Sequence, residues 1–590
     1  MQVTPQADLH QEHDKPLPRT SRSVRAAAAW VAASSMLLPW TALAQGSGAE
    51  WTTPSGNLEA TRYSTLTEIT SANVGTLVED FAVPTGVKAS HQGQPLVVGN
   101  RMYVVTPFPN RLLALDLSNN GLVLWTFNPG TNIYARGVAC CDVVNRGAVY
   151  ADGKVIYNLL DGNTVAVNAV TGKQVWRTQL GDVTTGESMT GAPIVVRDKV
   201  IVGNSGGENG VRGWVQALDL ATGAPVWKAF NTGPDVDVKI GPSFKPFYAK
   251  DKGTDLGATS WPGTMWQQGG STSWAWFSYD PVLNLVYHGT GNPGVWNPTM
   301  RPGDNKWGAS IFARNPDTGD AGWAYQLTPH DGWDYDAISE NIVVDLPING
   351  VTRKVIVHFD KNGFAYTIDR ASGRVLIANK FAEVTWADRV NLSTGRPVVN
   401  PGMSPAQGKI TTNICPSPLG AKEFAPSAYS AATGLFYVPA INFCNNLEPL
   451  KALYIAGTPF VGADAELFPG PGGFMGELIA WNASTGTRAW SIQETLPLYS
   501  GVLATAGNVV FYGTLDRWFK AVDATTGAVL FQKQLACGIV GNPISYTAPD
   551  GKQRIAVYSG TGWLAGGFAG GECPAKGGTG SGMVHVFKLP

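Results

Sequence analysis

One repeated pattern limits what this chain can fold into more than any other feature. A short apolar run leads to Asp or Asn, a turn glycine follows, and an aromatic residue stands four positions after that glycine. Six copies end at Trp125, Trp176, Trp227, Trp323, Trp490 and Phe531, and a degenerate copy, "AYTIDRASGRVL", lacks the aromatic residue. Each copy predicts two strands joined by a tight turn, because apolar residues alternate and glycine adopts positive φ easily.

The spacing of the copies predicts an all-β fold. The turn glycines are Gly121, Gly172, Gly223, Gly319, Gly373, Gly486 and Gly527, which lie 51, 51, 96, 54, 113 and 41 residues apart. The two double-length gaps indicate copies that are eroded or enlarged by inserted loops. Repeats of this length without long helical patterns are typical of a β-propeller. We predict about eight blades, with seven or nine compatible with the count, and tryptophan-docking repeats in which each aromatic residue packs against a neighbouring blade.

The N-terminus predicts export. Arg19, Arg22 and Arg25 precede the apolar run "AAAAWVAASSMLLPWTALA", which ends in the small-x-small pattern of residues 42–44. This arrangement is typical of a cleaved secretory signal peptide over residues 1–44. The run is short and contains Pro39, which argues against a membrane anchor. We therefore expect residues 45–590 to form a single propeller domain located in the periplasm.

Charge and cysteine content limit the possible partners. The net charge is -1 and no basic run is present, which argues against a nucleic-acid surface. Six cysteines fit an oxidising compartment: adjacent Cys140 and Cys141, then Cys415, Cys444, Cys537 and Cys573. Their order suggests a bond from Cys415 to Cys444 and one from Cys537 to Cys573, although order does not prove connectivity. Nothing in the spacing supports zinc, and the C-x-x-C-H motif of a covalent c-type haem does not occur.

Several segments break the repeat and carry the candidate chemistry. They are "GVACCDVVNRG" from Gly137, "SGGENGVRG" from Ser205, "GGSTSWAWFSYD" from Gly269, "YHGTGNPGVWNPTMRPGDNKW" from Tyr287, "TPHDGWDYDA" from Thr328 and "DKNGFAYTIDR" from Asp360. They place Glu208, Asn292, Asp334 and Asp336 beside strand-like runs. Carboxylate and amide oxygens are the donors that a hard cation such as calcium requires.

These segments, in this order, resemble the pyrroloquinoline quinone (PQQ)-dependent alcohol dehydrogenases, the quinoproteins that include methanol and ethanol dehydrogenases. The resemblance extends from "RYSTLTEITSANVGTL" to "SGTGWLAG" and is closest to members with one domain and no haem. It implies an eight-bladed propeller with PQQ near its axis. It also implies that Cys140 and Cys141 form a vicinal disulfide on one face of PQQ while Trp274 packs on the other, so that dispersion and exclusion of water hold the planar ring.

The resemblance implies further cofactor contacts. Arg146 matches an arginine at the polar edge of PQQ, where its paired donors suit carboxylates. Lys361 matches a basic residue that donates to the reactive carbonyl region. The remaining implied cofactor-site residues are Thr190, Ser205, Gly206, Gly207 and Trp518.

The resemblance also implies one metal ion and a catalytic base. Glu208 and Asn292 match metal ligands, and Asp334 matches the base, which also lies at the metal. Asp336 resembles a residue of the lanthanide-using members. An added carboxylate favours a trivalent ion over Ca2+, because it brings more negative charge and another oxygen donor. Calcium stays the alternative, with Asp336 as a hydrogen-bonded loop residue.

Two positions depart from the pattern of many relatives. Gln92, in "SHQGQP", stands where they carry glutamate in stretches like "HEGAP", and Ile441 stands where they carry asparagine before a cysteine, with Asn442 next. Both changes alter the polarity near the expected site, so the resemblance does not determine which PQQ contacts these two positions make.

The implied reaction is oxidation of a primary or secondary alcohol to an aldehyde or ketone. Asp334 would take the hydroxyl proton while hydride passes to C5 of PQQ, whose carbonyl the metal polarises. A separate soluble cytochrome c would receive the electrons. Trp296 matches a pocket aromatic of small-alcohol enzymes, but the Gly/Pro-rich segment after Asn446 could cap or widen the entrance, and we expect a substrate larger than methanol, such as a mycotoxin-like secondary alcohol or a polyol. A quinoprotein sugar dehydrogenase and a cofactor-free propeller scaffold are the alternatives.

Overall fold

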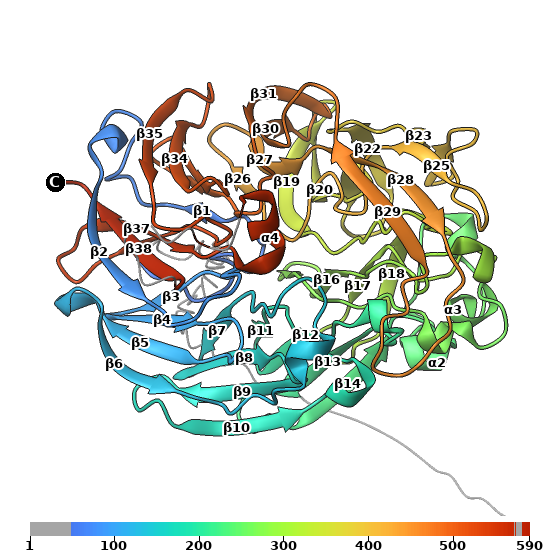
Figure 1. Cartoon of the computed structure of the whole chain (residues 1–590), viewed down its shortest axis with the longest axis horizontal. Helices are drawn as coiled ribbons and strands as arrows, with labels where there is room; N and C mark the ends of the chain where they lie inside the picture. The colour runs from blue at the N-terminus through green and yellow to red at the C-terminus, as the bar shows by residue number, and fades with distance from the viewer. Residues whose placement is uncertain (1–48, 571–572, 574–580) are drawn as a thin grey trace, which may run out of the picture. The chain divides into compact units, whose positions relative to one another are not determined.

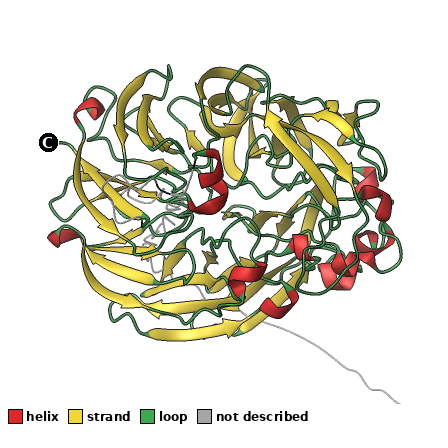
Figure 2. Ribbon diagram, viewed as in Figure 1, coloured by secondary structure: helices red, strands yellow, loops and turns green. Residues whose placement is uncertain are grey.

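Strands dominate the part of the chain that the computed structural model describes, residues 49–570, 573 and 581–590 (Figure 2). The predicted all-β class is confirmed. The predicted signal peptide lies outside the described residues. The α-helices are short: α1 (Ala135–Val138), α2 (Asp235–Val238), α3 (Leu256–Thr259) and α4 (Gly562–Phe568). The 3-10 turns are η1 (Val74–Thr76), η2 (Leu117–Asn119), η3 (Val183–Thr185), η4 (Gly207–Asn209), η5 (Ala249–Asp251), η6 (Met265–Gln268) and η7 (Pro298–Met300).

Antiparallel four-stranded sheets follow one another along the chain. The first four are β3 (Leu96–Val98), β4 (Arg101–Val105), β5 (Leu112–Asp116) and β6 (Leu122–Phe127); β7 (Ala148–Ala151), β8 (Lys154–Leu159), β9 (Asn163–Asn168) and β10 (Gln174–Gln179); β11 (Ile194–Val196), β12 (Lys199–Gly203), β13 (Trp214–Asp219) and β14 (Pro225–Phe230); and β15 (Phe277–Asp280), β16 (Leu285–Gly289), β17 (Ser310–Arg314) and β18 (Ala321–Gln326). Each predicted repeat forms the last two strands of one sheet.

The second half continues the series. Its sheets are β19 (Ile342–Ile348), β20 (Val351–Phe359), β21 (Phe364–Asp369) and β22 (Val375–Lys380); β26 (Ala428–Ser430), β27 (Leu435–Ile441), β30 (Gly476–Asn482) and β31 (Thr487–Glu494); β32 (Leu503–Thr505), β33 (Val509–Gly513), β34 (Trp518–Asp523) and β35 (Val529–Gln534), with β1 (Tyr63–Ser64) added; and β36 (Ile544–Thr547), β37 (Gln553–Ser559) and β38 (Met583–Lys588), with β2 (Val78–Pro84) added.

Inserted segments account for both double-length gaps between the turn glycines. The first gap holds α2, α3 and the loops around them. The second holds two small sheets, β23 (Ala387–Asn391) with β24 (Arg396–Val399), and β25 (Thr411–Ile414) with β28 (Phe443–Pro449) and β29 (Ala463–Pro469). Both double-length gaps therefore arise from insertions. Among the described residues, no eroded copy of the repeat lies between the two sheets that flank each gap.

The two ends of the described chain join in shared sheets. Strand β2 pairs antiparallel with β38, and β1 pairs parallel with β32. The buried guanidinium of Arg62 donates to the carbonyls of Pro54, Val502 and Pro543 at 2.8, 2.8 and 2.6 Å. Figure 1 shows the sheets succeeding one another in chain order, with β2 beside β37 and β38. Closure of the last sheet by a strand from the N-terminal end, here β2, is typical of a β-propeller.

The repeat aromatic of one sheet lies against the turn glycine of the next. A Cβ at Gly172 would lie 2.6 Å from the ring of Trp125, and one at Gly223 would lie 2.5 Å from that of Trp176. Both glycines have positive φ, so two independent constraints require glycine there. Trp176 Nε1 also donates to the Leu220 carbonyl at 3.2 Å. The same contact recurs for Trp227 with Gly319, Trp323 with Gly373 and Trp490 with Gly527.

All six cysteines are bonded in pairs. The bonds join Cys140 to Cys141, Cys415 to Cys444 and Cys537 to Cys573. The pairing suggested by sequence order and the vicinal bond implied by the resemblance are both confirmed. Within the described residues, every helix is too short or too polar to cross a membrane.

Candidate cofactor and active site

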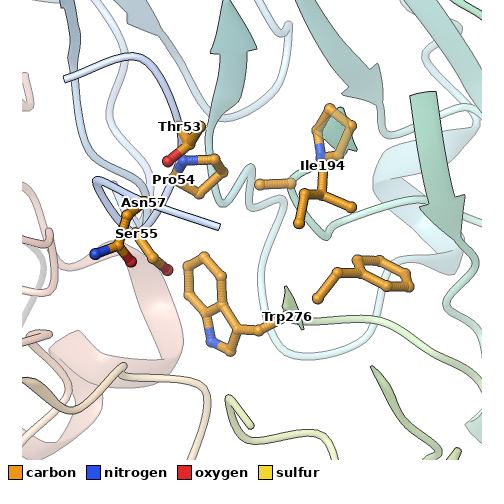
Figure 3. Close-up of a pocket in the computed structure, with 9 residues that line it drawn as sticks. Thr53, Pro54, Ser55, Asn57, Ile194 and Trp276 are labelled. Atoms are coloured by element: carbon orange, nitrogen blue, oxygen red, sulfur yellow. The ribbon is translucent and has the colours of Figure 1, made fainter. Parts of the chain in front are cut away.

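Two cavities that lie near each other differ greatly in volume, and only the larger one has room for a ligand. Figure 3 shows the smaller one, in which the indole of Trp276 faces Ile194 and the segment that runs from Thr53 to Asn57. Its volume of about 10 Å³ holds one water molecule at most. It is a packing gap. The indole nitrogen of Trp276 donates to the Phe424 carbonyl at 2.6 Å, which ties this region to the larger cavity.

The larger cavity has a volume of about 290 Å³ and collects residues from most of the chain. Its lining residues are Gln92, Cys140, Cys141, Val144, Arg146, Ser188, Thr190, Ser205, Gly206, Glu208, Thr272, Trp274, Asn292, Trp296, Asp334, Asp336, Lys361, Pro418, Leu419, Glu423, Phe424, Val461, Tyr499 and Leu564. Most of these lining residues lie in loops between strands. The sheets therefore position the loops, but few lining residues belong to the strands themselves.

The disulfide wall, Cys140 and Cys141, and the ring of Trp274 line the same cavity. Cys140 follows α1, and Trp274 lies in the loop before β15. The Arg146 guanidinium lies 4.6 Å from the centre of the Trp274 ring and 4.8 Å from that of Phe424. These contacts hold the cation over aromatic faces. Burial lowers the pKa of Arg146 to about 10, although Glu423 and Glu208 oppose the change, so this side chain stays charged at neutral pH.

Hydroxyl groups complete the polar edge around Arg146. Arg146 Nη1 donates to Thr190 Oγ1 at 2.7 Å, and Thr190 Oγ1 lies 2.8 Å from Ser205 Oγ. These bonds link the loop after the disulfide wall to the loop between β12 and β13. A ligand carboxylate at this edge would meet a charged donor and two hydroxyls.

Three buried polar atoms of lining residues have no hydrogen-bond partner in the described part of the chain. They are Gln92 Oε1, Arg146 Nε and Tyr499 Oη. Leaving a buried polar group unsatisfied costs about 1–3 kcal/mol each. Three such atoms around one cavity, with the disulfide wall and Trp274, fit a ligand that is planar and carries several polar groups.

Lys361 lies within the acidic part of the cavity. Its Nζ is 3.0 Å from Asp334 Oδ2, 2.8 Å from Asp336 Oδ2 and 3.6 Å from Glu423 Oε1. Asp336 Oδ1 also accepts from the backbone N–H of Asn292 at 2.6 Å. The loop that carries both aspartates is held by Asp331, whose carboxylate accepts from the N–H groups of Trp333 and Tyr335 at 3.0 and 3.1 Å.

Burial dominates the electrostatics of these groups. It raises the pKa of Asp334 well above its usual range; Lys361 opposes this, and Asp336 and Asp331 add to it. Burial also raises the pKa of Glu208, with a contribution from Asp336. Burial alone would lower the pKa of Lys361, but the neighbouring carboxylates outweigh it and the pKa rises well above its usual range. The site therefore concentrates negative charge that a cation would stabilise.

The predicted metal ligands share the cavity but do not form a closed cluster. Glu208, Asn292, Asp334 and Asp336 all line it. Among described residues, no group of three or more His, Cys, Asp or Glu is arranged to hold a metal ion. Lys361 lies between two of the four side chains. The donors are hard oxygens, as calcium and lanthanide ions require, and metal binding by this set stays a prediction.

Most predicted site residues come together, with two exceptions. Gly207, in η4, and Trp518, the first residue of β34, do not line the cavity. Of the two departures, Gln92 lines it, while Ile441 is buried in β27 and Asn442 donates to the carbonyls of Pro471 and Phe474. The Gly/Pro-rich segment after Asn446 includes the end of β28, all of β29 and the connection between them, and its Val461 lines the cavity.

The sequence did not single out Glu423, Phe424, Tyr499 or Leu564. Glu423 lies beside Lys361 and acts electrostatically on Arg146. Its signal in the sequence is a charge pair, Lys422 and Glu423, at the start of an otherwise apolar stretch. Tyr499 stacks near Phe568 of α4, with ring centres 6.2 Å apart. No motif marks it, because its role depends on contacts between distant segments.

Comparison with known proteins gives consistent matches. A family model described as "PQQ: Glucose/ethanol/alcohol dehydrogenase, beta-propeller domain" matches residues 51–390 and 479–555. The lanthanide-dependent methanol dehydrogenase of Methylacidiphilum fumariolicum (strain SolV) is 48% identical over 518 residues, covering 87% of this chain and 85% of that protein. The putative dehydrogenase XoxF of Paracoccus denitrificans is 45% identical, covering 92% and 94%. A solved europium-containing methanol dehydrogenase has a TM-score of 0.89 at 45% identity, covering 92% and 99%.

Proposed function

Since the chain belongs to the family of PQQ-dependent alcohol dehydrogenases, we propose that it oxidises an alcohol to an aldehyde or ketone with PQQ held in the large cavity. The observation that carries this proposal is the cavity itself. The disulfide wall, the Trp274 ring and three unpartnered buried polar atoms surround one space. A scaffold without a cofactor would have no use for these unsatisfied atoms.

We propose that the fold is an eight-bladed propeller. Seven four-stranded sheets and one five-stranded sheet in the described residues would each form a blade. The contacts between repeat aromatics and the turn glycines of the next sheet support docking of blade on blade. The cavity loops extend from these sheets, which therefore act as a rigid support.

The chain's own residues suit PQQ as a ligand. Arg146 would hold a carboxylate with paired donors, supported by Thr190, Ser205, Gly206 and Gly207. Lys361 Nζ would donate toward the reactive carbonyls, because its neighbours keep it protonated. When bound, PQQ supplies a quinone that accepts hydride from the alcohol carbon. The position of Trp518 outside the cavity lining favours Gln92 over Trp518 as a direct contact.

Glu208, Asn292, Asp334 and Asp336 would hold one metal ion, a lanthanide in preference to Ca2+. Asp336 supports the lanthanide, because a fourth oxygen side chain adds charge that a trivalent ion compensates better. In the protein alone, Lys361 offsets part of that negative charge through its contacts with Asp334 and Asp336. An ion bound there would take over this role and leave Lys361 free to donate elsewhere.

Asp334 would act as the general base. Its raised pKa makes the ionised form a stronger proton acceptor, and Lys361 keeps that form accessible. The apolar side chains of Trp296, Val461 and Leu419 would exclude water around the bound alcohol. A hydroxyl bound in this space would have Asp334 as a polar neighbour, because Asp334 lines the same cavity.

The partner, the compartment and the substrate complete the proposal. Residues 1–44 would act as the signal peptide that directs export, and a soluble cytochrome c would accept the electrons in the periplasm. Methanol is the substrate named for several relatives, including the methanol dehydrogenase [cytochrome c] subunit 1 of Methylobacterium organophilum. An alcohol larger than methanol stays our prediction. Comparing kcat/KM for methanol, ethanol, a bulky secondary alcohol and glucose tests it and separates the sugar dehydrogenase alternative.

The deciding experiment is reconstitution. Purified chain freed of cofactor and metal is mixed with PQQ and either La3+ or Ca2+, and PQQ binding and alcohol-dependent dye reduction are measured. We expect binding and turnover, with La3+ above Ca2+. Asp334→Asn should retain PQQ but lose turnover, while the exposed control Asp317→Asn should retain both. Absence of PQQ binding with either ion would refute the proposal, and full turnover by Asp334→Asn would refute the role of the base.

A further inference from the structure

Asp142 directly follows the disulfide wall and contacts three segments that line the cavity. Its side chain is buried, at 3% exposure. Oδ1 accepts from the N–H of Val143 at 2.7 Å. Oδ2 accepts from the N–H of Ser90 at 3.3 Å and from that of Trp563 at 3.2 Å. One carboxylate therefore joins parts of the chain that are more than 400 residues apart.

Each of these segments contributes a lining residue. Ser90 lies two residues before Gln92, and Trp563 lies beside Leu564 in α4. Asp142 itself is adjacent to Cys141. The cavity thus has a Gln92 side, an α4 side and the disulfide wall. The Asp142 carboxylate accepts from Ser90 on the first and from Trp563 on the second, and Asp142 is covalently adjacent to the third.

Helix α4 approaches Asp142 closely because Gly562 has no side chain. A Cβ at Gly562 would overlap Asp142 Oδ2 and would also contact Ser90 N at 2.6 Å. Gly562 has φ of +64°, which glycine adopts without strain. The bond from Cys537 to Cys573 ties the chain beyond the other end of the helix. Figure 1 shows α4 among the inner loops of the sheets, as such a contact requires.

We propose that Asp142 is a positioning residue that fixes the disulfide wall relative to α4 and the Gln92 side, and so sets the space left for the planar cofactor. The cofactor's identity rests on the proposed function. A carboxylate suits this role, because an ionised acceptor makes hydrogen bonds about twice as strong as a neutral one and has two oxygens for three donors. Asparagine would keep one of those oxygens and replace the other with a donor that faces an N–H.

Two variants approach the same contact from opposite sides. Asp142→Ala removes the acceptor, and Gly562→Ala displaces α4 from it. Asp142→Asn is the conservative change. Asp280→Asn is the control, because Asp280 is a buried carboxylate that accepts from the N–H groups of Val282 and Leu283 at 2.8 and 3.2 Å, pairs with Arg370 at 2.6 Å and does not line the cavity. It tests whether loss of a buried carboxylate anywhere has the same effect.

The first measurement is the dissociation constant of PQQ, titrated into the full chain loaded with La3+ or Ca2+ and freed of PQQ. Residues that orient metal ligands change metal affinity or activity by about tenfold to a hundredfold, and we take this range as the scale for a positioning residue. We expect weakening in that range for Asp142→Ala and Gly562→Ala, less for Asp142→Asn, and none for Asp280→Asn even though its melting temperature falls.

The second measurement needs no cofactor. The rate at which a phosphine reduces the Cys140–Cys141 bond is followed by mass spectrometry, with Cys415–Cys444 as the internal reference. Asp142→Ala and Gly562→Ala should raise the first rate and leave the second unchanged. Unchanged PQQ affinity together with an unchanged reduction rate would overturn the inference. If the unmodified chain does not bind PQQ, the proposed function fails, and the reduction rates alone decide whether Asp142 positions the disulfide wall.

Discussion

We predict that His91 makes the stability of this protein depend on pH. The imidazole is buried beside Gln92, where the two ends of the chain meet: Nδ1 lies 2.8 Å from the Ala89 carbonyl oxygen and Nε2 lies 2.9 Å from Thr85 Oγ1. Gly560 and Gly582 pack closely around the ring. Burial lowers the pKa of His91 to about 4 from 6.5, and the bond to Ala89 only partly opposes this. The folded protein therefore keeps His91 neutral at pH values where the unfolded chain protonates it.

The sign and size of the effect follow from proton linkage. The unfolded chain binds the extra proton below its pKa of 6.5, so this contribution to stability is complete above pH 6.5 and is lost as the pH falls toward 4. Linkage with these two values gives a loss of about 2 kcal/mol at pH 5 and about 3 kcal/mol below pH 4. His91→Gln removes the titration while keeping a donor and an acceptor.

The assay is denaturant unfolding followed by tryptophan fluorescence at pH 7.5 and pH 5, for the unmodified chain and for His91→Gln. The difference at pH 7.5 measures the packing cost of the substitution. Acidification should then destabilise the unmodified chain by about 2 kcal/mol more than the variant. Equal pH dependence in the two proteins would show that His91 is not neutral and buried in the way described.

Three further predictions concern packing, a buried ion pair and the cavity. Gly223→Ala should lower the free energy of unfolding by about 1–3 kcal/mol, because Cβ meets the Trp176 ring, whereas exposed Gly99→Ala meets no neighbouring atom and tests the cost of positive φ alone. Lys422→Met should lower the free energy of unfolding by about 3–5 kcal/mol, because it removes the ammonium that lies 2.9 Å from the buried Glu340 carboxylate. The double variant Lys422→Met with Glu340→Gln should recover much of that stability, and denaturant unfolding of both variants measures the difference. Trp274→Ala should weaken PQQ binding about tenfold in a fluorescence titration, through lost stacking and lost support of Arg146; unchanged affinity would exclude Trp274 as a stacking face.

The fold was predictable because it depends on a local pattern. In each repeat the apolar alternation, the turn glycine and the aromatic residue lie within about a dozen residues, and one such unit specifies two strands. The exact assignment of the double-length gaps was not predictable. A sequence gap between Gly373 and Gly486 looks the same whether it holds a lost repeat or β23, β24, β25, β28 and β29.

The site was predictable only where a motif carried it. Cys140, Cys141, Arg146 and Trp274 were found through the resemblance, and they line one cavity. Tyr499 was missed and Trp518 was selected, although the structure places Tyr499 and not Trp518 in the lining. The reason is geometric. Trp518 belongs to a repeat that resemblance recognises, whereas Tyr499 lies in a loop whose direction is set by packing against Phe424 and Phe568.

Charge in the cavity links the metal question to the role of Lys361. Four lining carboxylates, Glu208, Asp334, Asp336 and Glu423, face two lining cations, Arg146 and Lys361. Burial raises the pKa of Glu208, Asp334 and Glu423, which means that each costs free energy to ionise in the protein alone. A cation recovers that cost, and a trivalent ion recovers more of it than a divalent one at the same place. The lanthanide preference that we propose and the raised carboxylate pKa values would therefore be two results of one arrangement, and removing Asp336 should weaken both.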